Sequence, residues 1–228
     1  IVVGDGVSYE FAQDIIEKVS KEYTLSKEHQ YIFAGLPSET EHNMSQLYID
    51  SSTVVKDKQD REAYLLKQNK DKSIGFIDLE KVNETSDKEH YIICSYKDPD
   101  KLGETYQHKA LKYFDLVAGI FATKIEQLFK NGYQNVYLVT DHGFVLTGIL
   151  DNSDKIEVDF KGNVKISERF IRSENKQKID TNLLIEKEVV YNNFNYSYFA
   201  KRLGPFKSTG VYGFSHGGLS PQETIIPF

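Results

Sequence analysis

The sequence contains very little sulfur. Its 228 residues include one cysteine, Cys94, and one methionine, Met44. A single cysteine cannot form a disulfide within the chain, which excludes a disulfide-stapled secreted domain and favours a reducing compartment such as the cytoplasm. No stretch reaches the ~18 consecutive apolar residues that span a bilayer, and the apolar start at residues 1–4 is too short for a signal-peptide core. We therefore expect a soluble, cytoplasmic protein with no membrane partner.

Internal repeats, low-complexity segments and long basic tracts are also missing. The 28 Lys and Arg residues against 34 Asp and Glu residues give a formal net charge of −6. One stretch, residues 161–178, is locally basic and contains Lys161, Lys165, Arg169, Arg172, Lys176 and Lys178. Two interpretations of it are open: a solvated surface, or a wall that meets substrate phosphates.

The composition is that of a globular domain. With 39% hydrophobic and 13% aromatic residues, the chain can bury a substantial core, which excludes disordered, collagen-like and coiled-coil classes. Because the length is well below ~300 residues, we expect a single domain over residues 1–228. The chain starts with Ile1 inside an apolar run rather than with methionine, so we expect it to be part of a longer protein with flanking domains.

Apolar patterns alternate between strand and helix along the chain. Short β-branched and aromatic runs predict strands at residues 1–3, 31–34, 74–77, 91–95, 135–140 and 224–226. Apolar residues every three or four positions predict helices over 9–23 and 111–131, the second closed by Asn131-Gly132. This alternation predicts an α/β fold with a mostly parallel sheet sandwiched by helices.

Residues 151–215 have a different pattern. Short alternating stretches at 155–160, 164–166 and 184–191 are separated by turn signals such as Lys161-Gly162-Asn163. We expect a small, antiparallel, loop-rich insertion here.

Acidic residues follow three of the predicted strands. Asp5, the turn Asp98–Asp100 and the pair Asp141-His142 all stand at carboxyl ends, the edge where parallel sheets bind ligands. A carboxylate beside an imidazole, followed by the flexible Gly143, suits divalent metals. The alternative is a turn: Asp5 and Asp141 would then be turn formers, and His142 would pack locally.

Other residues extend this candidate site. His216 stands before two glycines, which give its backbone room to approach an ion, although an exposed turn fits as well. Asp100, Glu104 and His108 are spaced by four and would share one helix face, as ligands or as solvated surface. Thr40 lies at a predicted helix start, either as an N-cap or as a hydroxyl nucleophile in the positive field of the helix.

Three segments together resemble a known family. Residues 36–44 (LPSETEHNM), 139–144 (VTDHGF) and 216–227 (HGGLSPQETIIP) are similar to the PglZ domain of the alkaline phosphatase superfamily. The opening VVGDGVSYE, residues 2–10, resembles that domain's first strand with its metal-binding aspartate. The order and spacing agree over nearly the whole chain.

The resemblance implies a site with two divalent metals, usually zinc. One ion would be bound by Asp5, Thr40, Asp141 and His142. The other would be bound by Asp100, Glu104 and His216. The superfamily commonly has histidine where this chain has Glu104. Because a glutamate oxygen is a harder ligand, manganese is the alternative metal. His108 is the alternative ligand to Glu104. The family often has arginine at the position of Ser8.

The resemblance also implies a function. Thr40 would attack phosphorus, and water would hydrolyse the phosphothreonine. The expected substrates are phosphodiesters such as short oligonucleotides or cyclic nucleotides, with partner proteins in phage defence (BREX) or two-component signalling. Two alternatives stay open: a phosphomonoesterase, and a degenerate regulatory or scaffold module that binds metal or a phosphoryl group, which Glu104 and Ser8 favour.

Overall fold

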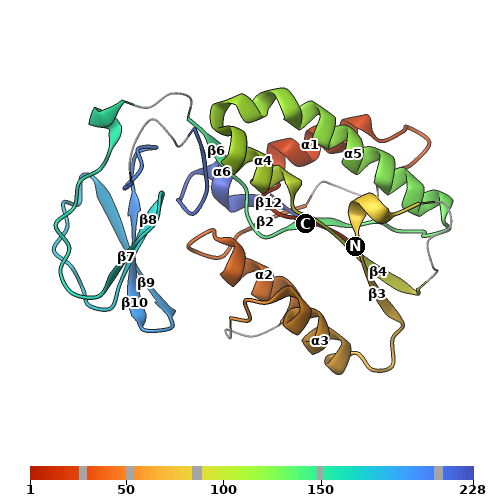
Figure 1. The fold of residues 1–228 in the computed structure, drawn as a ribbon, viewed down its shortest axis with the longest axis horizontal. Coiled ribbons are helices and arrows are strands. Elements are labelled where there is room, and N and C mark those ends of the chain that lie inside the picture. Colours follow the sequence, from red (N-terminus) through yellow and green to blue (C-terminus); the bar gives the residue numbers. More distant parts are fainter. Residues whose placement is uncertain (26–29, 50–53, 84–88, 148–150, 208–212) are drawn as a thin grey trace.

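The computed structural model describes residues 1–25, 30–49, 54–83, 89–147, 151–207 and 213–228 (Figure 1). Its helices are α1 Tyr9–Lys18, α2 Thr40–Tyr48, α3 Lys58–Gln68, α4 Asp98–Tyr106, α5 Leu111–Lys130 and α6 Pro221–Thr224, with short 3-10 turns at Leu79–Lys81, Gln107–Ala110 and Asn152–Asp154. Its strands are β1 Val2–Gly4, β2 Tyr31–Phe33, β3 Ile74–Asp78, β4 Tyr91–Tyr96, β5 Leu138–Thr140, β6 Val145–Leu146, β7 Val164–Ile166, β8 Phe170–Ser173, β9 Leu184–Tyr191, β10 Phe194–Ala200, β11 Phe214–Ser215 and β12 Ile225–Pro227.

The centre of the fold is a parallel sheet with the strand order β3-β4-β1-β5. Val2 is in register with Cys94 of β4 on one side and with Leu138 of β5 on the other. Helices α1 and α5 cover one face, and α2 and α3 cover the other (Figure 1). This arrangement confirms the predicted α/β fold with helices on both faces of a parallel sheet.

Apolar side chains fill both faces of this sheet. On one side Phe11, Val117 and Phe121 pack together with Val2 in the largest buried cluster. On the other side Val3 and Met44 belong to a smaller cluster. Each face of β1 is therefore buried, which accounts for its uninterrupted apolar sequence.

Several predicted boundaries were wrong. The helix predicted over 9–23 ends at Lys18, and the Ser20 backbone N–H then donates to Glu126 of α5 at 2.7 Å. The strand predicted over 135–140 begins only at Leu138. Residues 155–160 form no strand, and Ile156 packs instead in a loop bonded to Pro205.

Residues 164–200 form a separate antiparallel sheet with the order β7-β8-β10-β9. Ile171 and Tyr198 are fully buried in a cluster of its own. The predicted antiparallel character of this segment is confirmed, while the assignment of 151–215 as an insertion in a single domain stays a prediction. Among the described residues no helix is both long enough and apolar enough to span a bilayer.

Candidate metal centre

The three predicted acidic positions meet at the carboxyl edge of the parallel sheet. Strand β1 lies between β4 and β5, so the residues that follow these strands become neighbours. The Asp100 backbone N–H donates to the Asp5 carbonyl at 3.2 Å, and the Gly6 N–H donates to Asp141 Oδ1 at 3.2 Å. Backbone hydrogen bonds therefore join the three loops.

Gly143 allows the 141–143 loop to lie against the C-terminal segment. Its N–H donates to the Glu223 carbonyl at 3.0 Å, and a Cβ at this position would overlap the carbonyl oxygen of Gln222. The glycine of the Asp141-His142-Gly143 motif is thus required by close backbone approach.

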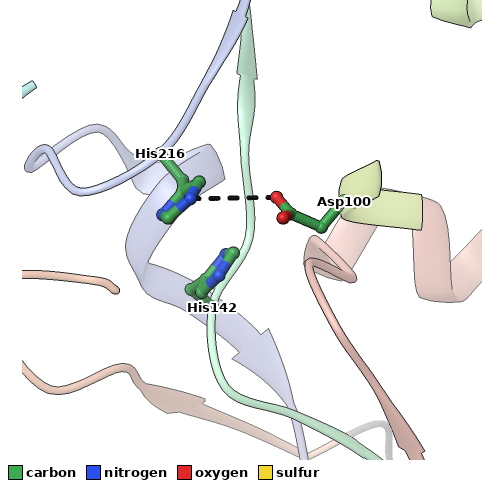
Figure 2. A group of neighbouring side chains, drawn as sticks. All are labelled: Asp100, His142 and His216. Carbon is green, nitrogen blue, oxygen red and sulfur yellow. Dashed lines mark ion pairs between the residues drawn. The ribbon is translucent and has the colours of Figure 1, made fainter. Parts of the chain in front are cut away.

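Two groups of side chains could each hold a cation. The ligand atoms of Asp5, Asp141 and His142 lie within 4.8 Å of one another, and so do those of Asp100, His142 and His216. Figure 2 shows Asp100 pointing from the start of α4 towards the two imidazoles. The imidazole rings are parallel, with centroids 3.9 Å apart.

The electrostatics of the carboxylates fit a cation. Asp5 Oδ1, Asp100 Oδ1 and Asp141 Oδ2 are buried and have no hydrogen-bond partner among the described residues. Burial, followed by the charges of Asp141 and Asp100, raises the pKa of Asp5 to about 9. Burial raises the pKa of Asp141 to about 7, against a lowering hydrogen bond from Gly6. Each of these oxygens lies 3.3–3.8 Å from an imidazole Nε2 without a hydrogen bond from a described residue. A divalent cation would neutralise such converging carboxylates.

His142 is held in a form suited to ligation. Its Nδ1 lies 2.9 Å from the Gly143 carbonyl, which can only accept, so Nδ1 carries the proton and Nε2 is free as an acceptor. Burial, with the charge of His216 next, holds the pKa of His142 well below its usual value. Thr40 Oγ1 lies 3.0 Å from Nε2 and donates to it. The candidate nucleophile is therefore in place beside the candidate ligands.

The His216 loop is fixed by Ser38, a residue to which the sequence had assigned no role. His216 Nδ1 donates to the Ser38 carbonyl at 2.9 Å, and the Gly217 N–H donates to Ser38 Oγ at 3.1 Å. Gly217 has a φ of +106°, which explains the glycine there. Burial alone would lower the pKa of His216, but Asp100 and the Ser38 bond raise it.

Glu104 and His108, the other candidate ligands, lie outside the two ligand groups, and Thr40 does not cap its helix. Glu104 shares helix α4 with Asp100 but is exposed and belongs to neither group of close ligand atoms. His108 does not lie on that helix face, since α4 ends at Tyr106 and Gln107 has a φ of +53°. Thr40 is the first residue of α2 rather than its N-cap, which is Glu39.

The side chain of Ser8 is already used within the fold. Its hydroxyl accepts from the Phe11 N–H at 3.2 Å and so caps helix α1. The position where the family often has arginine is therefore a helix cap in this chain.

Two arginines of the basic stretch are buried, contrary to both interpretations of that stretch. Arg169 pairs with Glu223 through two contacts, Nε to Oε1 at 3.0 Å and Nη2 to Oε2 at 3.1 Å. Glu223 in turn accepts from the backbone N–H groups of Gly218 and Ser220. The pair anchors the turn that follows His216. The lysines 161, 165, 176 and 178 are exposed.

Arg172 links the antiparallel sheet to the start of α2. Its Nη2 lies 2.6 Å from Glu39 Oε1, and its guanidinium lies 3.7 Å from the ring centroid of Tyr191. The geometry is that of an ion pair rather than an aligned hydrogen bond, since the Nε, Nη1 and Nη2 atoms lack aligned partners among the described residues. The Tyr191 hydroxyl donates to Glu41 at 2.9 Å. Both neighbours of Thr40 are thus held from the second sheet.

We expect a measurable coupling between Arg172 and Glu39. Either Arg172→Met or Glu39→Gln alone leaves a charge unpaired in a buried site, whereas the double variant removes both, so the losses of unfolding free energy should be non-additive by about 0.5–3 kcal/mol. Urea denaturation of the four proteins measures this coupling. The control is the pair Lys176–Glu186, whose lysine is exposed and whose glutamate is half-buried, with an expected coupling of about 0–1 kcal/mol. Equal coupling in the two cycles would contradict the prediction.

Solved structures share this fold at low sequence identity. Murine ectonucleotide pyrophosphatase/phosphodiesterase 5, as an inactive threonine-to-alanine variant with AMP, has a TM-score of 0.60 and 9% identity over 100% of this chain and 86% of that one. Phosphonoacetate hydrolase from Sinorhizobium meliloti 1021, with phosphonoacetate, has a TM-score of 0.61 and 9% identity over 100% and 88%. No curated protein matches the sequence.

A family model matches more than half of the sequence. The match covers residues 100–228 and is to the BREX system PglZ alkaline phosphatase-like domain. It includes Asp100, Asp141, His142 and His216 of the candidate centre. The family and the fold together support a hydrolase of the phosphoesterase class. The chain belongs to the PglZ family of alkaline phosphatase-like domains.

Proposed function

We propose that the chain is a metal-dependent phosphodiesterase that acts on nucleotides, with Thr40 as its nucleophile. The observation that carries this proposal is the position of the Thr40 hydroxyl, 3.0 Å from His142 and beside two groups of metal-type ligands. The inactive form of the murine structural neighbour replaces a threonine by alanine and contains AMP, which is consistent with a threonine nucleophile and a nucleotide substrate.

The residues present suit two divalent ions, zinc or manganese. Asp5, Thr40, Asp141 and His142 would hold one ion, and Asp100 and His216 the other; Glu104, exposed on the same helix as Asp100, would have to turn towards that ion to join them. When bound, such ions polarise phosphoryl oxygens and stabilise negative charge on the attacking and leaving oxygens. The buried carboxylate oxygens of Asp5, Asp100 and Asp141 that accept no hydrogen bond from a described residue support this assignment.

The chain's own residues supply the covalent chemistry. Thr40 Oγ1 forms a bond to phosphorus while the bond from phosphorus to the leaving oxygen breaks, and water then hydrolyses the threonine phosphate and restores the hydroxyl. Thr40 begins α2, so backbone N–H groups without helical partners lie in the same turn and can donate to phosphoryl oxygens.

The test combines metal content with two substrates. We expect two equivalents of divalent metal per chain, metal-dependent hydrolysis of a bis-aryl phosphodiester, and slower hydrolysis of the matching aryl monoester. Metal at about 100 times its Kd should add ~2.7 kcal/mol of stability, a rise in Tm of roughly 5–10 °C. A chelator should remove both the hydrolysis and the added stability, and zinc or manganese should restore them.

Two other results would support a different function. Faster hydrolysis of the monoester would indicate a phosphomonoesterase. Binding of one metal or none, without hydrolysis of either ester, would indicate a regulatory or scaffold module, which the exposed position of Glu104 and the capping role of Ser8 favour.

The setting of the activity is also part of the proposal. The family description names a BREX system, which supports a role in phage defence in the cytoplasm together with partner proteins of that system. Two-component signalling, with flanking domains in a longer protein, is the alternative setting. Co-purification of the full-length protein with its native partners distinguishes the two.

A further inference from the structure

A cavity of about 320 Å³ adjoins the candidate centre and shares Asp5 and Thr40 with it. Helices α2 and α3, which lie on the same face of the sheet, and the ends of β1 and β4 form its walls (Figure 1). Its volume is at the lower end of the ~300–1,000 Å³ typical of ligand sites. The cavity therefore has room for one group of nucleotide size next to the reacting phosphorus.

The cavity wall is rich in cations, although the chain as a whole is acidic. Four basic residues line it: Lys56, Lys58, Arg61 and Lys97. The acidic residues on the wall are Glu41 and Asp57, in addition to the candidate ligand Asp5. Once Asp5 is assigned to a metal ion, the wall has an excess of positive charge.

Two of these cations have unused hydrogen-bonding capacity. The Lys97 side chain forms no ion pair or hydrogen bond with any described residue, and it lines the cavity together with Asp5. Arg61 is only 8% exposed, and its Nε has no hydrogen-bond partner in the described part of the chain. Its Nη1 donates to the carbonyls of Val55 and Lys56, which fixes the guanidinium in the wall.

The other two lysines are only partly engaged. Lys56 pairs with Glu41 at 3.0 Å at an exposed position. Lys58 donates to Ser95 Oγ at 2.7 Å and forms longer ion pairs with Asp78 at 3.6 Å and Glu62 at 3.7 Å. Exposed ion pairs contribute little to stability and can exchange partners. An anionic group in the cavity would thus meet two cations without a carboxylate partner among the described residues, Lys97 and Arg61, and two lysines whose ion pairs can exchange.

From this arrangement we propose that the cavity is a subsite for a second phosphate of the substrate, next to the phosphodiester that Thr40 attacks. The proposal rests on the proposed phosphodiesterase function and specifies its substrate class: linear nucleotides with a phosphate adjacent to the scissile one. The subsite also explains how a chain with a net charge of −6 accepts a polyanion, since the positive charge is local.

The test compares dinucleotides that differ only in a terminal phosphate. Substrates are a dinucleoside monophosphate and its 5′- and 3′-phosphorylated forms, used with the metal-loaded protein. We expect kcat/KM to be roughly 10-fold or more higher for one phosphorylated form, as expected for a charge-assisted hydrogen bond. The preference should fall as salt is raised.

Variants from two elements identify the subsite. Lys97→Met and Lys58→Met should each reduce the preference for the terminal phosphate to within about threefold of unity. Lys67→Met is the matched control, since Lys67 lies on the same helix α3 as Lys58, is exposed and does not line the cavity. An undiminished preference in both cavity variants would overturn the proposal.

Binding to the metal-loaded Thr40→Ala variant separates this proposal from the proposed function. Tighter binding of a phosphorylated dinucleotide, without turnover of any diester by the wild type, would support the subsite and reject the phosphodiesterase. Equal binding and equal kcat/KM for all three dinucleotides, with turnover intact, would overturn the subsite and leave the phosphodiesterase standing.

Discussion

Replacing Thr40 with alanine is expected to lower kcat for phosphodiester hydrolysis at least about 10³-fold and to leave the fold intact. Thr40 is half-buried, and the one hydrogen bond of its hydroxyl to a described residue is to His142 Nε2 at 3.0 Å. Its removal leaves no buried apolar contact unfilled in the core clusters. The loss therefore falls on the reaction rather than on stability.

Matched variants separate the hydroxyl from the shape of the side chain. Thr40→Val keeps the branched shape without the hydroxyl and should be as inactive as Thr40→Ala, whereas Thr40→Ser keeps the hydroxyl and should retain much of the activity. Steady-state kinetics on a bis-aryl phosphodiester, with Tm as the check on folding, measure the effect. Near-normal turnover by metal-loaded Thr40→Ala would mean that water attacks phosphorus directly.

The second large effect is expected at Glu223, where Glu223→Gln should destabilise the protein by about 3–5 kcal/mol because it leaves Arg169 buried without its counter-charge. The two side chains are 0% and 2% exposed. The Glu223 carboxylate also accepts from the N–H groups of Gly218 and Ser220 and from the Ser220 hydroxyl, so one substitution weakens four interactions. A loss in Tm on the order of 10 °C follows.

The pH dependence of this contribution has a defined sign. Burial alone would raise the pKa of Glu223, but the hydrogen bond and charge of Arg169 lower it below its usual value of 4.5. The stabilisation is therefore present at neutral pH and is lost as pH falls below about 4.5. Thermal unfolding of the wild type and the variant at several pH values should show the two curves converging in acid.

The control for Glu223→Gln is Glu188→Gln, the same substitution at an exposed position of β9, which should change stability by less than about 0.5 kcal/mol. A fall in Tm at Glu223 no larger than at Glu188 would show that the Arg169 pair does not hold the turn after His216.

Local features of the sequence were sufficient to predict several of the helices and strands that surround the site. Helix α5 was predicted nearly to the residue because its apolar residues repeat at helical spacing and Gly132, with a φ of +95°, stops it. The position of Asp5, Asp100 and Asp141 after strands followed from the same kind of pattern. Recognition of the family also needed only sequence, since the motifs at residues 36–44, 139–144 and 216–227 are short and contiguous.

Apart from the metal ligands that the family resemblance brings together, contacts between distant segments were not predicted. The burial of Arg169 and Arg172 depends on Glu223 and Glu39, partners 54 and 133 residues away, so a basic stretch looked like surface. Helix α3 was missed because its charged sequence has only a weak period. His108 was placed on the wrong face because a single left-handed residue, Gln107, ends α4 early.

The sequence by itself determined which residues stand at strand ends, where the long helix begins and ends, and which family the chain resembles, because backbone periodicity and turn chemistry are local properties. Only the tertiary structure decided that β1 lies between β4 and β5, that His142 and His216 stack, and that Glu104 lies outside both ligand groups. Strand order and burial depend on the summed packing of segments far apart in the chain, and no local window contains that information.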